Sequence, residues 1–263
     1  MNLWQGLILG LVQGLTEFLP VSSSGHLVLV EALTGVHFTD VTVEVSLHVA
    51  TLASVLVLYG RRLWEIVRGV LTGDGPSIRY AVLLVIATIP AGLIGVLFHH
   101  QIEDAFHSLA WLGIQFLVTG VILWSTKGPP PEAGTETVPS TGAATVIGFA
   151  QAFAILPAIS RSGATIAAAL RAGLTPAAAG EFSFLMSIPV IAGAGLLEAR
   201  NAALNMVHVG ALPWAVSFVA AFAAGIWSIR WLVALLKRGR FYAFAPYCWA
   251  VGLFTLAYAL WHG

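Results

Sequence analysis

Apolar residues run along most of this chain in long stretches that short polar segments interrupt. A helix needs roughly 17–25 mainly apolar residues to cross a bilayer, and six stretches approach or exceed that length. They are Val43–Gly60, Tyr80–Phe98, Leu109–Ser125, Phe182–Glu198, Pro213–Leu236 and Phe244–Trp261. Because the runs are continuous rather than alternating, they predict membrane-spanning helices and argue against a transmembrane β-barrel.

Composition excludes an ordinary soluble domain. Of the 263 residues, 58% are hydrophobic and 9% are charged, whereas a soluble domain carries about 25% charged residues. The net charge is zero, so no basic surface indicates nucleic acid as a partner. The predicted fold class is therefore an all-α polytopic protein embedded in the lipid bilayer.

Two further apolar regions are broken in the middle. Met1–Gly35 is interrupted by Pro20 and a run of serines, and Gly142–Gly173 is interrupted by Pro157 and the letters SRSG. Non-helical backbone at membrane depth is tolerated only where protein buries it or water reaches it. We therefore expect both breaks to lie at a polar site inside the protein.

Arginine and lysine in short loops indicate the cytoplasmic side of a membrane protein. Two loops carry such residues, one with Arg61, Arg62, Arg68 and Arg79 and the other with Lys237, Arg238 and Arg240. The loop His99–His107 has neither residue type and is expected outside. Counting spans from these loops places a flexible linker, 127–141, in the cytoplasm, and gives the two broken regions opposite orientations.

An internal duplication accounts for this arrangement. A shift of 138 residues without gaps superposes identical residues of the two broken regions, namely Gln13 on Gln151, Ser22 on Ser160, Ser24 on Ser162, Gly25 on Gly163 and Gly35 on Gly173. The prediction is one integral membrane domain, 1–263, built from an inverted-topology repeat. Repeat one covers about 1–126 and repeat two about 142–263, with about six transmembrane helices and two broken re-entrant helix pairs. Such folds place a polar site at the repeat interface.

Ionisable side chains concentrate at the two breaks. Gln13 and Glu17 are four residues apart and share one helix face, as Ser23 and His26 do if the helix resumes at Ser23. The second break adds Arg161. This set suits phosphoryl transfer to water: Ser23 or His26 attacks phosphorus, Glu17 or His26 moves protons, and Arg161 stabilises the phosphoryl charge.

The helix that restarts after each break offers amides and hydroxyls to an anion. The groups expected to bind phosphate are Ser22, Ser24, Gly25, Ser160, Ser162, Gly163 and Thr165. For Ser22, Ser24 and Thr165, hydrogen bonds to carbonyls or across helices are an equally good explanation.

Four ionisable residues have a structural alternative as well. Glu17 and Arg161 could form a structural ion pair, although ionisable groups inside membranes are usually functional. His48 is expected to pack or to hydrogen-bond. Glu181 stands at the start of a span, where capping or the helix dipole explains it.

Two segments carry a resemblance to a known family. QGLTEFLPVSSSGHL (13–27) and LPAISRSGATIAAAL (156–170) resemble the signature regions of the undecaprenyl-diphosphate phosphatase family, also called bacitracin-resistance proteins. IATIPAGLIGVLF, EFSFLMSIPVIAGAGLLE and KRGRFYAFAPYCWAVGL resemble the same family, so the likeness covers nearly the whole chain. The resemblance implies a membrane phosphatase that converts a polyprenyl diphosphate to the monophosphate carrier lipid of cell-envelope polymer synthesis. It also implies that the enzyme confers bacitracin resistance and uses magnesium or calcium as its cofactor.

The family's first motif falls on Gln13 and Glu17, which the resemblance implies as metal ligands, and its serine and histidine fall on Ser23 and His26. Gln13 is neutral where many relatives have glutamate, which weakens any mechanism with two carboxylates on the metal.

The second motif falls on Pro157 through Thr165, with Ser160 and Arg161 at matching places. Ala158 stands where the family usually has glycine, and this substitution is expected to restrict the turn.

The resulting hypothesis is a multi-pass plasma-membrane phosphatase whose site opens to the external side. Ser23 is the preferred nucleophile, followed by His26, and a metal-activated water stays open. The alternatives are a transporter or flippase for polyprenyl phosphate lipids, which uses the same architecture, and a structural or partner-binding membrane protein. The prenyl chain length, the metal and a homodimer are left open.

Overall fold

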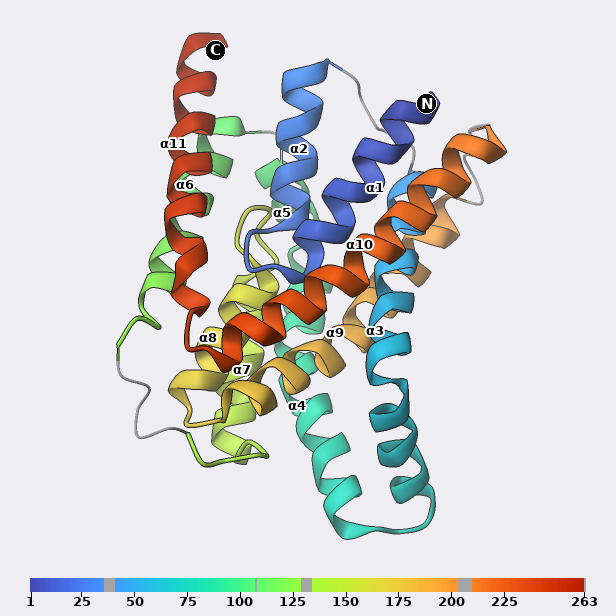
Figure 1. Ribbon diagram of the computed structural model, residues 1–263, viewed down its shortest axis with the longest axis vertical. Helices are drawn as coiled ribbons and strands as arrows, with labels where there is room; N and C mark the ends of the chain where they lie inside the picture. Colours follow the sequence, from blue (N-terminus) through green and yellow to red (C-terminus); the bar gives the residue numbers. More distant parts are fainter. Residues whose placement is uncertain (36–40, 107, 129–133, 203–209, 263) are drawn as a thin grey trace.

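The computed structural model describes residues 1–35, 41–106, 108–128, 134–202 and 210–262, and most of these residues lie in helices (Figure 1). The elements are α1 (Leu3–Phe18), α2 (Ser23–Thr34), α3 (Val41–Leu71), α4 (Gly75–Leu97), α5 (His99–Phe106), α6 (Leu109–Trp124), α7 (Thr141–Phe153), α8 (Arg161–Arg171), α9 (Pro176–Ala202), α10 (Ala211–Lys237), the 3-10 helix η1 (Phe241–Phe244) and α11 (Ala245–His262). The predicted all-α class is confirmed.

Membrane-spanning helices form the frame of the molecule. Within the described ranges, four helices are long and apolar enough to cross a bilayer, or five if the bent pair α5–α6 counts as one span. The four are Gly75–Leu97, Pro176–Gly193, Ala211–Lys237 and Phe241–His262. The sequence predicted six. The expected span Val43–Gly60 lies in α3, a helix of 31 residues whose second half carries Arg61, Arg62 and Glu65. The expected loop His99–His107 is largely the helix α5, with His107 outside the described residues.

Helix boundaries in the two halves follow the 138-residue offset. α1 begins at Leu3 and α7 at Thr141, and α2 begins at Ser23 and α8 at Arg161, so both pairs of starts differ by 138. Gly35 ends α2 and Gly173 follows α8, each with the positive φ that favours glycine (64° and 88°). The halves interleave, because α1 packs along α10, α7 along α4, α3 against α9 and α6 against α11.

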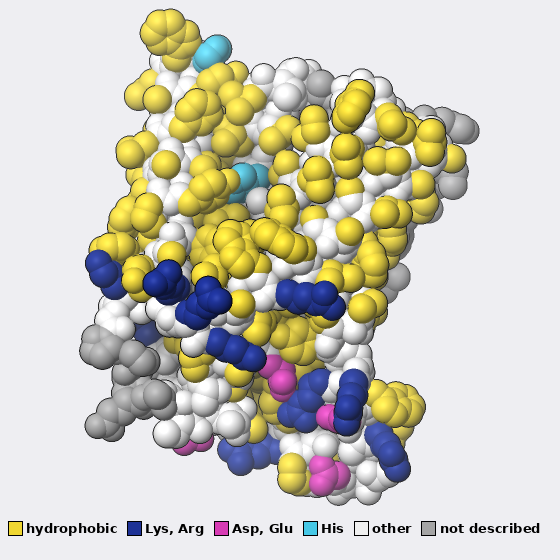
Figure 2. All heavy atoms as spheres, in the orientation of Figure 1, with side chains coloured by type: hydrophobic (Ala, Val, Ile, Leu, Met, Phe, Trp, Pro, Cys, Tyr) yellow, Lys and Arg dark blue, Asp and Glu magenta, His cyan; other side chains and the backbone are white. Residues whose placement is uncertain are grey.

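The two broken helix pairs open toward opposite ends of the molecule. In Figure 1 both α1 and α2 run upward from their break, so the chain enters and leaves at the upper end. The ends of the other pair meet at the lower end, where Thr175 N donates to Glu136 O (2.9 Å). Figure 2 shows lysine and arginine side chains gathered in the lower half of the visible face, and apolar side chains above them.

The linker 127–141 is more ordered than the sequence indicated. Glu136 pairs with Leu174 in an isolated bridge, and Glu136 N donates to Gly173 O (3.3 Å). Residues 129–133 of this linker lie outside the described ranges. Backbone hydrogen bonds therefore attach the second half of this linker to the residues that follow α8.

Glycines allow α1 to lie directly against α10. A Cβ added to Gly6 would lie 2.6 Å from Pro213 O, and one on Gly10 would come still closer to Ser217 O. Small residues spaced four apart let two membrane helices approach backbone to backbone. This contact sets the position of α1 and hence of the side chains at its inner end.

Gly10→Ala is expected to lower stability by roughly 1–3 kcal/mol, because the added methyl overlaps the α10 backbone. The measurement is thermal unfolding of the purified protein in detergent. Gly92→Ala is the matched control, since no atom lies within 4 Å of a Cβ at Gly92 in α4. Equal unfolding temperatures for the two variants would contradict the close contact between α1 and α10.

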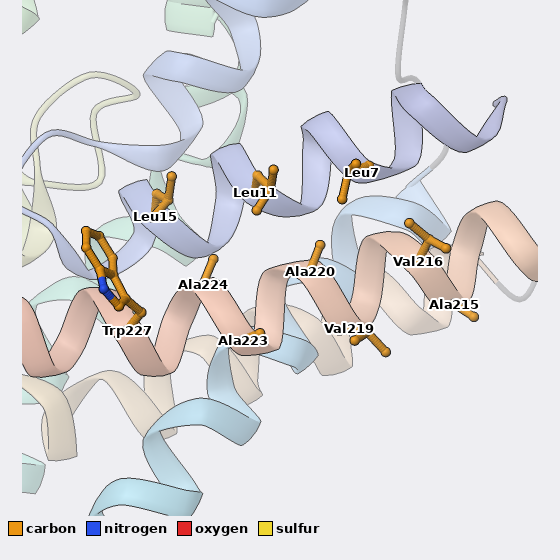
Figure 3. A pocket seen from close by; sticks show the side chains of 10 residues that line it. All are labelled: Leu7, Leu11, Leu15, Ala215, Val216, Val219, Ala220, Ala223, Ala224 and Trp227. Carbon is orange, nitrogen blue, oxygen red and sulfur yellow. The ribbon is translucent and has the colours of Figure 1, made fainter.

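The outer surface of the α1–α10 pair forms a groove of about 720 Å³ (Figure 3). Leu7, Leu11 and Leu15 line it from α1, and Val219 and Trp227 are among the residues that line it from α10. Its side chains are apolar apart from one indole nitrogen, so it offers nothing to hold a diphosphate. In a bilayer this groove contacts lipid.

Glu181 at the start of α9 has a larger role than helix capping. Its Oε1 accepts from Arg62 Nε (2.9 Å) and from the Tyr80 hydroxyl (3.4 Å), and Arg62 also lies over the Tyr80 ring, 5.1 Å from its centroid. The explanation by capping alone was therefore incomplete, because α3, α4 and α9 meet at this carboxylate.

Candidate active site

The first break separates α1 from α2 by only four residues. α1 ends at Phe18, because Leu19 is extended and Pro20 supplies no amide. Ser22 then adopts φ +68°, which is rare for a residue with a side chain and costs about 1–3 kcal/mol. Ser22 caps α2, which resumes at Ser23 as predicted.

The second break is longer and is held by α6. Between α7 and α8, Ala158 N donates to Gln115 Oε1 (2.8 Å), and Ala158 O accepts from Thr119 Oγ1 (2.8 Å). Ser160 caps α8 through a bond from Gly163 N to its Oγ (3.1 Å). Ala158 does not have a positive φ, so the turn accepts alanine without the restriction expected from the family's glycine.

Reciprocal hydrogen bonds join the two breaks. Ser24 Oγ donates to Pro157 O (2.7 Å), and Ser162 Oγ donates to Leu19 O (3.3 Å). The 138-residue offset relates the two donors, Ser24 and Ser162, and likewise the two acceptors, Leu19 and Pro157. Each break is therefore bonded to the other in the same way. Ser22 Oγ adds a third bond to Pro157 O (2.6 Å). These bonds satisfy carbonyls that the broken helices leave free, as buried backbone requires.

Glu17 lies at the centre of the polar site. Its Oε1 accepts from Arg161 Nη2 (2.6 Å), and its Oε2 accepts from Ser23 Oγ (2.6 Å) and from Gln13 Nε2 (3.0 Å). The structure thus brings together four of the residues that the sequence singled out. They come from α1, α2 and α8, and 144 residues separate the two partners of the ion pair.

Burial makes the Glu17–Arg161 pair strong and hard to break. Glu17 is 8% exposed, and the Arg161 side chain is 15% exposed. Removing one member of a buried ion pair leaves an uncompensated charge, which typically costs about 3–5 kcal/mol. The pair therefore fixes the carboxylate in one orientation, with Ser23 on its second oxygen.

His48 from α3 also belongs to this site, which the sequence reasoning missed. Its Nδ1 lies 3.2 Å from Gln13 Nε2 and 3.9 Å from Glu17 Oε2. Hydrogen bonding was expected of His48, but not its position beside the carboxylate. The available signal was an ionisable side chain within an apolar span, which usually indicates function.

A cavity of about 190 Å³ opens beside the ion pair. Its polar lining comes from both breaks, from α3 and from α7, and comprises Glu17, Ser22, Ser23, Ser24, His48, Gln151, Ser160 and Arg161. The cavity is large enough for a phosphate group.

Four of the expected phosphate-binding residues do not line the cavity. They are Gly25, Ser162, Gly163 and Thr165. Gly25 N and Gly163 N are capped by serine side chains, and Thr165 Oγ1 donates to Arg161 O (2.8 Å). The expectation of free amides is wrong for Gly25 and Gly163, because serine side chains cap them, whereas Thr165 follows the alternative of a hydrogen bond to a carbonyl.

Comparison with known proteins identifies the relatives of the chain. Residues 6–254 match the family model described as bacitracin resistance protein BacA. The chain belongs to the BacA family. It is 40% identical over 266 residues to a protein named undecaprenyl-diphosphatase from Desulfosudis oleivorans, covering 96% of this chain and 97% of the relative. Proteins of the same name from Desulforapulum autotrophicum and Bacteroides fragilis (strain ATCC 25285) are 37% and 39% identical, each covering 97% of this chain and 98% of the relative.

His26, which the sequence placed in the site, is held by hydrogen bonds at both ring nitrogens. Its Nδ1 donates to Ser22 O (2.6 Å), and its Nε2 lies 2.7 Å from the Tyr247 hydroxyl. The Tyr247 ring stacks on the imidazole with an interplanar angle of 3°. Ser22 O can only accept, so Nδ1 carries the proton and Nε2 accepts from Tyr247. Both ring nitrogens are engaged, and a chemical role for His26 stays a prediction.

Tyr247→Phe is therefore expected to reduce phosphatase activity less than about tenfold while lowering stability by about 1 kcal/mol, the usual value of one hydrogen bond. Activity and thermal unfolding are measured on the same preparation. A loss of activity above about 100-fold at unchanged stability would show that His26 works in the chemistry after all.

The oxygen atoms of this BacA family site suit a hard divalent cation. Magnesium and calcium prefer carboxylate, amide and hydroxyl oxygens. Glu17 and Ser23 supply two such groups, and the buried Gln13 Oε1 has no hydrogen-bond partner in the described part of the chain. Within the same part, no three His, Cys, Asp or Glu side chains form a metal-binding group. A cation here would depend on substrate oxygens for much of its coordination.

Proposed function

We propose that this chain is an integral membrane phosphatase that hydrolyses undecaprenyl diphosphate to undecaprenyl monophosphate and inorganic phosphate. The observation that carries the proposal is the hydrogen bond from Ser23 Oγ to Glu17 (2.6 Å), beside an arginine and a cavity of phosphate size. The names of the relatives support the same substrate.

The geometry supports a covalent mechanism. Glu17 takes the Ser23 proton as Oγ attacks the terminal phosphorus, the Oγ–P bond forms and the bridging P–O bond breaks. Undecaprenyl monophosphate leaves, and water then hydrolyses the phosphoserine to inorganic phosphate. A nucleophile bonded to a base that a third group orients is the usual arrangement for such catalysis, and Arg161 and Gln13 orient Glu17.

Arg161 serves both the base and the substrate. Its Nη2 holds Glu17, and Arg161 also lines the cavity, where its other donors can reach phosphoryl oxygens. Arg161 is also the first residue of α8, so the positive end of that helix dipole lies at the same place. Fixed charge of this kind stabilises the negative charge that develops on the phosphoryl group.

Magnesium or calcium fits this proposal as a cofactor held by Gln13, Glu17 and the diphosphate. When bound, such an ion neutralises phosphate charge and favours the phosphate as a leaving group. In the protein, Gln13 would keep its amide group on Glu17 and present its oxygen to the ion.

The distribution of charged side chains supports an orientation of the protein across the plasma membrane. Lysine and arginine gather in the lower half of the face that Figure 2 shows, and α1 and α2 open at the upper end in Figure 1. By the positive-inside rule the lower end is cytoplasmic. The chain would thus lie in the plasma membrane with the site opening outward, supplying carrier lipid for envelope polymers and conferring bacitracin resistance. The two inverted repeats, 1–126 and 142–263, and a homodimer are part of the same proposal.

The test is release of inorganic phosphate from undecaprenyl diphosphate by the purified protein in detergent, with magnesium or calcium present. The product lipid is identified by mass spectrometry as the monophosphate. A stoichiometric release of one phosphate for each lipid is expected. Intact diphosphate after prolonged incubation with well-folded protein would refute the function.

The architecture favours one second candidate, a lipid flippase. Two broken helix pairs that meet between inverted halves are typical of secondary transporters. Reconstituted vesicles separate the two functions, because a flippase moves labelled polyprenyl phosphate between leaflets. Transfer that persists in Arg161→Ala, without phosphate release, would favour transport.

A further inference from the structure

Gln151 is a polar residue of the cavity to which the mechanism above assigns no role. It lies near the end of α7, is 2% exposed, and lines the same cavity as Glu17 and Arg161. Its Oε1 is buried and has no hydrogen-bond partner among the described residues. An unsatisfied buried acceptor costs about 1–3 kcal/mol, so a ligand that supplies a donor or a positive charge would remove this cost.

The orientation of the Gln151 amide follows from its other end. Nε2 donates to Ala87 O (3.3 Å), a carbonyl that can only accept. A flipped amide would place two acceptors against each other, so the oxygen is the free atom. Gln13, which the 138-residue offset relates to Gln151, behaves alike: its Nε2 donates to Glu17, and its Oε1 is unpartnered.

Charge decides which ligand this oxygen takes. Glu17 and Arg161 neutralise each other, so a bound diphosphate adds net negative charge to a buried cavity. A lone acceptor oxygen repels phosphate oxygens but binds a hard cation, for which amide carbonyls are ordinary ligands. With one carboxylate in the cavity, further protein ligands have to be neutral oxygens.

We propose that Gln151 Oε1 is a ligand, contributed by the second broken helix pair, of the divalent cation that accompanies the diphosphate. This inference rests on the proposed function for the identity of the diphosphate. It extends the ligand set from the first break, Gln13 and Glu17, to both halves of the chain. A cation held this way requires the two breaks to be closed on each other.

The test is a magnesium titration of thermal stability, with purified protein in detergent and inorganic pyrophosphate as the probe. Wild type is expected to show a saturable rise in unfolding temperature. In Gln151→Leu, which keeps the bulk and removes the oxygen, the magnesium midpoint should rise about tenfold or more, since even outer-shell groups contribute that much to metal affinity. Thr255→Val is the matched control, because Thr255 is fully buried and its hydroxyl donates to Val251 O of its own helix.

Gln151→Glu is the second variant in the magnesium titration, and it tests the proposal even if Gln151→Leu does not fold. It keeps an oxygen and adds a charge, so its midpoint should fall below that of wild type. An unchanged midpoint in Gln151→Leu, or an unchanged or higher one in Gln151→Glu, would overturn the proposal. Phosphate release is measured separately: inactive wild type with a normal magnesium shift would refute the function and leave the cation ligand standing.

Discussion

Arg161→Ala is expected to lower phosphate release from undecaprenyl diphosphate by about 10²–10³-fold, the usual effect of removing one preorganised donor to a developing negative charge. The substitution removes the hydrogen bond that Glu17 Oε1 accepts in the described part of the chain. It also removes the guanidinium from the lining of the cavity. Arg161→Lys should recover part of the rate, because an ammonium keeps the charge but not the planar pair of donors. Initial rates at saturating lipid measure both variants.

Two controls separate this chemistry from loss of fold. Arg230→Ala removes an exposed arginine of α10, and should retain full activity. The double variant Glu17→Gln/Arg161→Met removes both charges, so it should unfold at a higher temperature than Arg161→Ala and stay inactive. Full activity in Arg161→Ala would exclude a site shared by the two breaks.

Ser23→Ala is expected to abolish phosphate release to within detection, a loss of about 10³-fold or more for a nucleophile. Its hydroxyl donates to Glu17 Oε2, so removal also leaves the base without the proton it takes. Wild type incubated with diphosphate labelled in its terminal phosphate and quenched in acid should carry label on Ser23. The variant should carry none.

Ser24→Ala, at the next residue, is the control for Ser23→Ala in the same activity measurement. Its hydroxyl donates to Pro157 O rather than to the carboxylate, so its activity should fall less than about tenfold, the value of one neutral hydrogen bond. Activity in Ser23→Ala within about tenfold of wild type, with no labelled protein, would instead indicate attack by a water molecule with Glu17 as base.

Local rules of sequence predicted the breaks and their boundaries well. Pro20 and the serine run end α1 and restart α2 at Ser23, and Ser160 caps α8, because these effects act over one helical turn. The Gln13–Glu17 spacing placed both side chains on one face for the same reason.

What local rules could not predict was the use of each hydrogen-bonding group. Thr165 and the amides of Gly25 and Gly163 looked available to phosphate. In the structure these groups instead donate hydrogen bonds to oxygens of the two breaks. His26 shares a helix with Ser23, yet the position of α11 decides that its ring pairs with Tyr247. His48 and Gln151 enter the site because α3 and α7 pack there.

The sequence by itself determined that the protein lies in a membrane, that two apolar segments break, and that the halves repeat at 138 residues. Each of these follows from hydrophobicity, proline geometry or identity along the chain. The tertiary structure decided that Arg161 meets Glu17 across 144 residues and which hydroxyl faces the carboxylate. Those contacts depend on the relative positions of helices, which a one-dimensional pattern does not specify.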